Sequence, residues 1–199
     1  MNRKREIGIF SGSFNPIHNG HLIMANYMCE FTTLDEVWLI VTPHNPLKKR
    51  TDMLDEQVRL KMVELAVEKY ENIKACDVEL HMKRPSFTIN TLEKLSHEYP
   101  ECNFSLIIGA DNWSFFDKWK DYNKIIENYK ILIYPRHKAE VIIPESLQET
   151  IILVNAPIIE ISSTFIRHSI KEGRNIRAFL LPEVYDYIES EELYRHEKP

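Results

Sequence analysis

The sequence predicts an α/β fold, with one doubly wound, Rossmann-like parallel sheet, helices on both of its faces and a helical C-terminal segment. Short apolar runs, typical of strands buried on both faces of a sheet, alternate with segments of helical periodicity. The chain has 199 residues, 44% of them hydrophobic and 28% charged, which is typical of a globular protein and enough to bury one core. We therefore expect a single domain over residues 1–199.

The first half of the chain begins with an apolar strand at Ile7–Phe10. A helical pattern follows from about His21 to Phe31, and a second apolar strand is expected at Val37–Val41. Apolar residues recur at helical spacing from Leu54 to Tyr70, which predicts another helix. The segment "ACDVEL", which follows that helix, alternates apolar and polar residues and is expected to form a strand.

The second half continues this alternation. A helix is expected at Thr88–Tyr99, and the tail from Ser162 to about Tyr194 is expected to be mostly helical. Further strands are expected within the apolar stretches at 104–111, 129–135, 150–157 and 158–162. In a doubly wound sheet the ligand binds beyond the carboxyl ends of the strands, so the polar loops at that edge should converge. These loops are residues 11–20, 42–49, 109–113, 134–137 and 161–164.

Charge and cysteine content exclude several classes of function. A net charge of -5 and an isoelectric point near 5.9 argue against non-specific duplex binding, although not against a small phosphorylated ligand. Cys29, Cys76 and Cys102 lie far apart, which favours free thiols over a disulfide framework or a zinc site. The first apolar run stops at Ser11, too early for a signal peptide, and no stretch approaches the length of a membrane span. We expect a cytoplasmic protein without nucleic-acid or membrane partners, and a homo-oligomer is left open.

The stretch "GSFNPIHNGH", which follows the first strand, has the composition of an anion-binding loop. Gly12 and the serine beside it let backbone N–H groups approach a ligand closely. Asn19 or Gly20 can cap the next helix, and free N–H groups at a helix N-terminus favour anions. His18 and His21 are three residues apart, so both lie on one side of the first helical turn. A Gly/Ser turn before a helix is also common in loops that bind nothing.

The stretch contains neither a GxxxxGK[ST] phosphate loop nor a GxGxxG dinucleotide fingerprint. It resembles the HxGH signature of the nucleotidylyltransferase superfamily, which stands here as His18-Asn19-Gly20-His21. The segment "ISSTFIR", which ends at Arg167, resembles the ISSTxIR motif of the same superfamily. A serine that caps a helix and an arginine one turn further on suit a polyphosphate.

Four other segments narrow the resemblance to nicotinate-nucleotide adenylyltransferase, a bacterial enzyme family of NAD synthesis. They are "TPHNPLKK", "RPSFTINTL", "GADN" and "DKW", and the resemblance extends from about Ile7 to Tyr187. The chain departs from the family pattern at Ser11, where glycine is usual, and at Asn90, where aspartate is common. It also has "RHK" after Pro135, where Arg-Pro-Gly is usual.

The resemblance implies that the 5′-phosphate of nicotinate mononucleotide attacks the α-phosphorus of ATP, which yields deamido-NAD and pyrophosphate. A phosphate monoester is already a nucleophile near neutral pH, so the reaction needs positioning and charge stabilisation rather than a strong base. The implied catalytic residues are His18, His21, Lys48 and Arg167. The implied ATP-binding residues are Gly12, Ser13, Phe14, Gly109, Asp111, Ile161, Ser162, Ser163 and Thr164. The implied mononucleotide-binding residues are Asn45, Thr88, Trp119 and Arg136. Mg²⁺ is expected to arrive on the triphosphate, without a metal site of the protein's own.

Other interpretations stay open at this point. Trp119 either stacks on the pyridine ring or packs in the core, because "NWSFFDKW" holds four aromatic residues. Related enzymes accept nicotinamide mononucleotide or phosphopantetheine, and cytidylyltransferases share HxGH but use CTP. A class I aminoacyl-tRNA synthetase would need a longer chain. A non-catalytic nucleotide-binding module would be expected to lose His21 or Arg167, and both are present.

Overall fold

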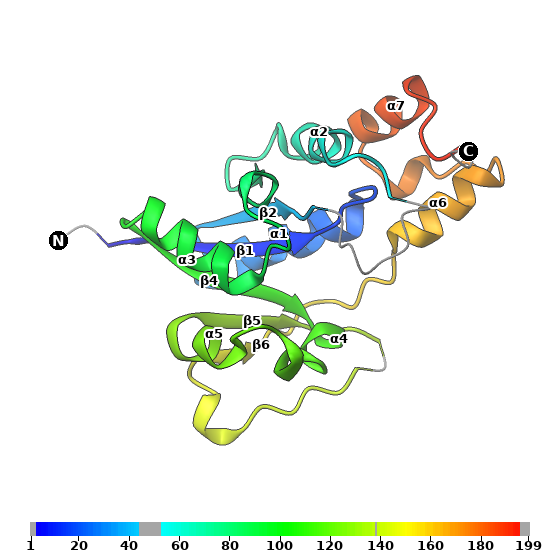
Figure 1. Ribbon diagram of the computed structural model, residues 1–199. Coiled ribbons are helices and arrows are strands. Elements are labelled where there is room, and N and C mark those ends of the chain that lie inside the picture. The colour runs from blue at the N-terminus through cyan, green and yellow to red at the C-terminus, as the bar shows by residue number, and fades with distance from the viewer. Residues whose placement is uncertain (1–2, 44–52, 138, 196–199) are drawn as a thin grey trace.

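The computed structural model describes residues 3–43, 53–137 and 139–195 (Figure 1). One six-stranded sheet has the order β3-β2-β1-β4-β5-β6, and every neighbouring pair of strands is parallel. This is the strand order of a doubly wound sheet, in which the winding reverses between β1 and β4. The predicted α/β class with a parallel sheet is confirmed.

The strands of the sheet are β1 (Arg5–Gly12), β2 (Glu36–Val41), β3 (Ile73–Cys76), β4 (Cys102–Gly109), β5 (Lys130–Tyr134) and β6 (Ile151–Leu153). The helices are α1 (Asn19–Phe31), α2 (Glu56–Val67), α3 (Thr88–Glu98), α4 (Ala110–Trp113), α5 (Tyr122–Asn128), α6 (Ser163–Lys171) and α7 (Pro182–Ser190). Short 3-10 helices occur at Val78–His81, Phe116–Lys118, Glu145–Leu147 and Arg177–Phe179. Within the described residues no helix is both long and apolar enough to cross a bilayer.

Alternate residues of the strands face two separate cores. Phe10 and Leu39 pack with residues of α1, α2, α6 and α7 on one face of the sheet. Ile9 and Ile40 pack with residues of α3, α4 and α5 on the other face. Because both faces are covered, the strands are continuous apolar runs rather than alternating ones. In Figure 1 the arrowheads of β1 and β4 point toward the side where α6 lies.

Two strand predictions were wrong. The strand expected at 75–80 is instead β3, which begins at Ile73 and ends at Cys76 opposite Ile40. Residues from Val78 onward would lie beyond the end of β2 at Val41. Those later residues form the 3-10 helix that begins at Val78. The strand expected at 158–162 has no regular secondary structure, because β6 is the last strand of the sheet and the chain continues directly into α6.

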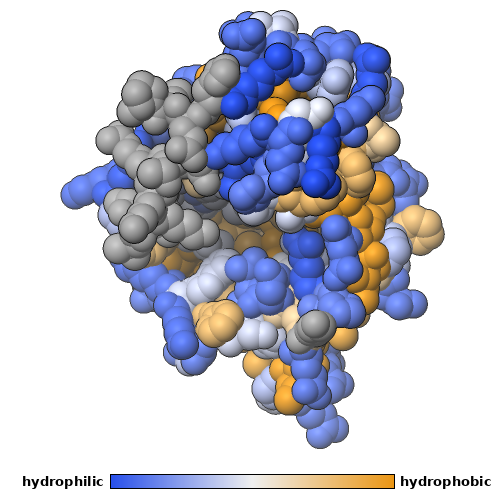
Figure 2. Space-filling model, turned by 90° about the vertical axis from the view of Figure 1, so that its right-hand side faces the viewer, coloured by the Kyte–Doolittle hydropathy of each residue, from blue (hydrophilic) through white to orange (hydrophobic). Residues whose placement is uncertain are grey.

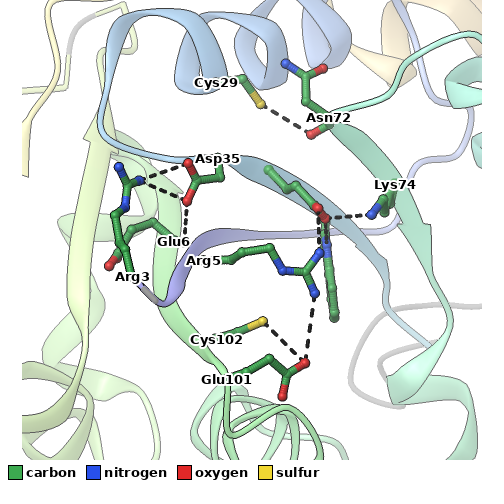
Figure 3. Close-up of polar contacts among 11 residues, drawn as sticks. Arg3, Arg5, Glu6, Cys29, Asp35, Asn72, Lys74, Glu101 and Cys102 are labelled. Atoms are coloured by element: carbon green, nitrogen blue, oxygen red, sulfur yellow. Dashed lines mark hydrogen bonds and ion pairs between the residues drawn. The ribbon is translucent and has the colours of Figure 1, made fainter. Parts of the chain in front are cut away.

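Charged side chains join neighbouring strands at the amino ends of the sheet (Figure 3). Arg5 lies 3.0 Å from Glu36 and 3.9 Å from Glu101, and Lys74 lies 2.8 Å from the same Glu36. Partly exposed ion pairs of this kind contribute on the order of 1 kcal/mol or less each. The opposite edge, at the carboxyl ends of the strands, carries the loops that the sequence predicts to hold the ligand.

Candidate active site

A cleft of about 520 Å³ opens at the carboxyl edge of the sheet. Figure 2 shows this side of the molecule, where hydrophilic residues surround a recess with a hydrophobic floor. His18 and His21 line the cleft from the start of α1, Asp111 from just after β4 and Arg136 from just after β5. The segment Ile161–Ser163, at the start of α6, lines it as well. Four of the five predicted loops therefore converge, and the fifth, residues 42–49, lies mostly outside the described residues.

The loop between β1 and α1 has an unusual backbone. Phe14 has a φ of +44°, in the left-handed region, and its side chain is buried. Its ring contacts the His21 ring edge-on, with 5.0 Å between the centroids. A Cβ at Gly12 would lie 3.0 Å from the Phe14 ring, so a side chain there would displace that ring. The Asn15–Pro16 peptide bond is cis.

His18 and His21 form a stacked pair at the start of α1, with ring centroids 3.7 Å apart. The expectation that Asn19 or Gly20 caps this helix was wrong, because His18 is the N-cap residue. The His18 backbone N–H donates to Nδ1 of His21 at 3.2 Å, which satisfies a donor at the helix start. A neutral His21 that accepts at Nδ1 carries its proton on Nε2 and can donate from that atom.

Both imidazoles are neutral at pH 7. Burial, with a smaller effect of the Arg136 guanidinium, lowers the pKa of His18 to about 4. Burial, followed by the charges of His18 and Arg136, lowers the pKa of His21 well below its ordinary value. A polyanion in the cleft would oppose these shifts, because a nearby negative charge favours the protonated imidazole. The pair therefore suits a ligand that brings negative charge.

Two buried polar side-chain atoms in the described part of the chain lack a hydrogen-bond partner, Nδ1 of His18 and Nε of Arg136. Both residues line the same cleft. Buried polar atoms are nearly always paired in native proteins, and an unpaired one costs about 1–3 kcal/mol. A polar ligand or a water molecule in the cleft could supply partners for both atoms.

α6 begins at the predicted "ISST" motif. Ser162 is its N-cap, and the Ser162 hydroxyl accepts the Phe165 backbone N–H at 3.1 Å. The prediction that one of the two serines caps a helix is therefore confirmed for Ser162. Ile161, just before the cap, lines the cleft together with Ile159. The motif thus contributes both an apolar wall and a helix start to the cleft.

The same motif is bonded to the loop after β1. The Ser163 hydroxyl donates to the Pro16 carbonyl at 2.8 Å, and Nη1 of Arg167 donates to the Asn15 carbonyl at 2.9 Å. Nη2 of Arg167 lies 3.5 Å from the Thr164 hydroxyl. Part of the donor capacity of Ser163 and Arg167 is therefore used to hold the loop.

The ends of β4 and β5 form another wall of the cleft. Nη2 of Arg136 donates to the Tyr134 hydroxyl at 3.2 Å, and the guanidinium lies over the Tyr134 ring, 5.0 Å from its centroid. Nε of Arg136 lies 3.9 Å from Asp111. A Cβ at Gly109 would lie 2.3 Å from Oδ1 of Asp111, so glycine lets this carboxylate fold back over the end of β4. Arg136 thus lies beside the residues expected on the ATP side.

The other residues predicted to bind the mononucleotide are not gathered in this cleft. Thr88 is the first residue of α3, and neither Thr88 nor Trp119 lines the cleft. Trp119 is partly buried, and its ring centroid lies 5.1 Å from that of Phe116. Asn45 and Lys48 lie outside the described residues.

Sequence reasoning missed two residues that contact the loop. Arg59, on α2, is fully buried and donates to the Ser13 carbonyl. Tyr194 donates its hydroxyl to Oδ1 of Asn15 at 2.9 Å. Arg59 belongs to an ordinary amphipathic pattern and Tyr194 to a charged tail, so no local signal separates either from packing or surface residues.

Comparison with known proteins identifies the family. Residues 9–169 match the family model described as cytidylyltransferase-like. The chain is 50% identical over 194 residues to a Flavobacterium johnsoniae protein named "Probable nicotinate-nucleotide adenylyltransferase", with coverage of 96% of this chain and 99% of the relative. The chain belongs to the nicotinate-nucleotide adenylyltransferase family. A Bacteroides fragilis protein of the same name is 51% identical, with coverage of 93% of this chain and 92% of the relative.

The fold of this chain is similar to that of a solved structure. It is titled "Plasmodium falciparum nicotinic acid mononucleotide adenylyltransferase complexed with NaAD", and its TM-score is 0.76. The match covers 96% of this chain and 97% of that one, at 20% identity. Both proteins therefore share the fold of the sheet described above.

Proposed function

We propose that this chain transfers the adenylyl group of ATP to the 5′-phosphate of nicotinate mononucleotide, which releases pyrophosphate and forms deamido-NAD in NAD biosynthesis. The observation that carries the proposal is a pair of buried nitrogens without a hydrogen-bond partner, Nδ1 of His18 and Nε of Arg136, in the cleft of a chain from this family. A triphosphate offers the oxygen atoms and the negative charge that these groups lack.

The chemistry is an in-line substitution at phosphorus. A phosphate oxygen of the mononucleotide forms a bond to the α-phosphorus of ATP, and the bond from that phosphorus to the pyrophosphate oxygen breaks. The attacking group is already an anion, so the protein needs no strong base and acts through positioning and charge stabilisation. His21 donates from Nε2 and Arg136 supplies positive charge, while Arg167 and Lys48 are proposed to neutralise phosphates.

The remaining ATP contacts follow from the walls of the cleft. We assign backbone contacts to the triphosphate to Gly12, Ser13 and Phe14, and donors from the start of α6 to Ser162, Ser163 and Thr164. Asp111 and Gly109 are assigned to the adenosine side, where a carboxylate accepts from ribose hydroxyls. Ile161 contributes apolar surface to the same nucleotide.

We propose that Mg²⁺ binds in the cleft as a companion of the triphosphate. Among the described residues no cluster of three or more His, Cys, Asp or Glu side chains could hold a metal ion. Asp111 and Glu160 are the carboxylates in the cleft lining, and Mg²⁺ commonly binds through one or two carboxylates, waters and substrate phosphates. We infer that Mg²⁺ enters with ATP and neutralises phosphate charge there.

The domain organisation and the location of the protein in the cell are also proposals. We propose that residues 1–199 form a single nucleotidylyltransferase domain, because one sheet carries both cores of the described chain. We also propose that the protein acts in the cytoplasm. The free thiols of Cys29, Cys76 and Cys102 support that location, since cytoplasmic conditions keep thiols reduced.

The acceptor is tested by steady-state pyrophosphate release from Mg-ATP, with nicotinate mononucleotide and nicotinamide mononucleotide supplied separately. We expect kcat/KM to favour the acid by about 10–100-fold, because hydrogen bonds to a charged group contribute about 1.5–3 kcal/mol. The donors are proposed to lie at the start of α3, near Thr88. Equal use of both acceptors would contradict carboxylate recognition. Measurable ATP binding without pyrophosphate release would favour a non-catalytic nucleotide-binding module.

Trp119→Ala tests the proposed stacking on the pyridine ring. We expect KM for the mononucleotide to rise about tenfold with little change in KM for ATP, because stacking of a base on an aromatic side chain contributes about 1–3 kcal/mol. Trp113→Ala is the matched control, since the Trp113 ring also contacts the Phe116 ring and Trp113 is also partly buried. If Trp119→Ala weakens both substrates equally, its role is core packing.

A further inference from the structure

Side chains from elements far apart in the sequence contact the loop between β1 and α1. Arg59 comes from α2, and its side chain is fully buried. Its Nη1 donates to the Ser13 carbonyl, and its Nε donates to the Leu54 carbonyl at 3.1 Å. A buried guanidinium bonded to main-chain carbonyls holds them in a fixed arrangement, because its planar fork has a rigid geometry.

Tyr194 comes from the C-terminal segment beyond α7 and is 8% exposed. Its hydroxyl donates to Oδ1 of Asn15 at 2.9 Å, and the Leu54 backbone N–H donates to the same oxygen at 3.3 Å. Burial raises the pKa of the Tyr194 hydroxyl, so this group stays a donor across the neutral range. The C-terminal segment is thus bonded to a loop near the start of the chain.

These contacts flank the strained residue of the loop. Ser13, which is bonded to Arg59, precedes Phe14, and Asn15, which is bonded to Tyr194, follows it. The φ of +44° at Phe14 lies in a region that a non-glycine residue keeps only when its surroundings hold it there. The flanking hydrogen bonds supply such a restraint on both sides.

Phe14 connects this restraint to the histidine pair. Its ring touches the His21 ring edge-on at 5.0 Å, and the two planes make an angle of 80°. His21 in turn stacks on His18. If the loop relaxes around Phe14, the imidazole that faces the cleft loses the wall against which it packs.

We propose that Tyr194 and Arg59 are positioning residues, which hold the loop around Phe14 and thereby fix His21 for catalysis. The kinetic test of this inference rests on the proposed function. If the inference holds, the C-terminal segment beyond α7 supports the active site. Neither residue belongs to the HxGH or ISSTxIR motif.

Tyr194→Phe tests the proposal, since it removes one hydroxyl and keeps the ring. In steady-state pyrophosphate release we expect kcat to fall about tenfold with little change in KM for the mononucleotide, because a misplacement of 1 Å costs on the order of 10²-fold. Tyr187→Phe removes a hydroxyl from the preceding helix α7, and it should retain the wild-type kcat. Arg59→Lys keeps the buried charge but loses the fork that reaches two carbonyls, and it should lower kcat in the same way.

A second readout does not depend on turnover. The imidazole NMR signals of His21 should shift in Tyr194→Phe and stay in place in Tyr187→Phe. If the wild-type chain releases no pyrophosphate, the proposed function fails, and these signals alone decide whether Tyr194 positions His21. Unchanged His21 signals and, in an active enzyme, a wild-type kcat in Tyr194→Phe would overturn the proposal. A lower melting temperature alone is the pattern of a purely structural contact.

Discussion

Replacing His21 by alanine is expected to lower kcat for adenylyl transfer by on the order of 10²–10³-fold, the usual cost of removing one preorganised donor from a reacting centre. The geometry gives the reason. Nδ1 of His21 already accepts the His18 backbone N–H at 3.2 Å, so the neutral ring has its proton on Nε2. Pyrophosphate release at saturating Mg-ATP and nicotinate mononucleotide measures the loss.

Two further variants separate this loss from an effect on folding. His21→Gln keeps an acceptor at the third helical position, where glutamine bonds to the N-cap N–H, so its melting temperature should stay near the wild-type value. It should still have a strongly reduced kcat, because the imidazole is gone. His97→Ala removes an exposed histidine at the end of α3 and should leave kcat unchanged. A wild-type kcat in His21→Ala would show that the stacked pair has no part in the reaction.

The free energy of unfolding should fall as the pH is lowered from 7 to 5. Burial holds the pKa of His18 near 4 in the folded chain, against an ordinary value of 6.5, so the unfolded chain binds more protons in this range. The stability that His18 contributes is complete above pH 6.5 and is lost as the pH falls toward 4. This contribution amounts to about 3 kcal/mol, because each unit by which folding lowers the pKa of a histidine corresponds to about 1.4 kcal/mol. His21, whose pKa is also lowered, acts in the same direction.

Urea unfolding at pH 7, 6 and 5 measures how steeply the free energy of unfolding changes with pH. In His18→Gln the slope should be smaller, because a neutral amide takes up no proton. Burial raises the pKa of Glu79, which opposes the histidines, but Glu79 is present in both proteins and cancels in the comparison. His97→Gln is the matched exposed control. Parallel pH profiles for the wild type and His18→Gln would mean that His18 titrates normally in the folded chain.

The fold was largely predictable because burial on both faces gives strands a strong local signal. β1, β2, β4 and β5 each contain a continuous apolar run, and each appears where that run occurs. At 75–80 the local pattern suited a strand, but β3 stops close to the end of its partner β2, and at 158–162 no strand of the sheet is a partner. Strand pairing is a tertiary property, and it does not follow from the composition of one segment. The short helices α4 and α5, of four and seven residues, are too brief for a periodic signal.

The sequence was enough to predict which residues line the cleft where those residues directly follow strands of the sheet. His18, Asp111 and Arg136 come after different strands, and the rule for carboxyl ends was enough to bring them together. Their actual contacts were not predictable. The N-cap role of His18 and the bond from Arg167 to the Asn15 carbonyl depend on how the loop folds around Phe14. The proposed roles of these residues in catalysis stay predictions.

A competition experiment, with products identified by mass spectrometry, tests the proposed adenylyl transfer to nicotinate mononucleotide. The wild-type protein is mixed with Mg²⁺ and equal concentrations of ATP, CTP, nicotinate mononucleotide and nicotinamide mononucleotide. We expect deamido-NAD as the main product, formed together with pyrophosphate. A cytidylyl product, or NAD in an equal or greater amount, would contradict the assignment of ATP and the nicotinate acceptor to this cleft.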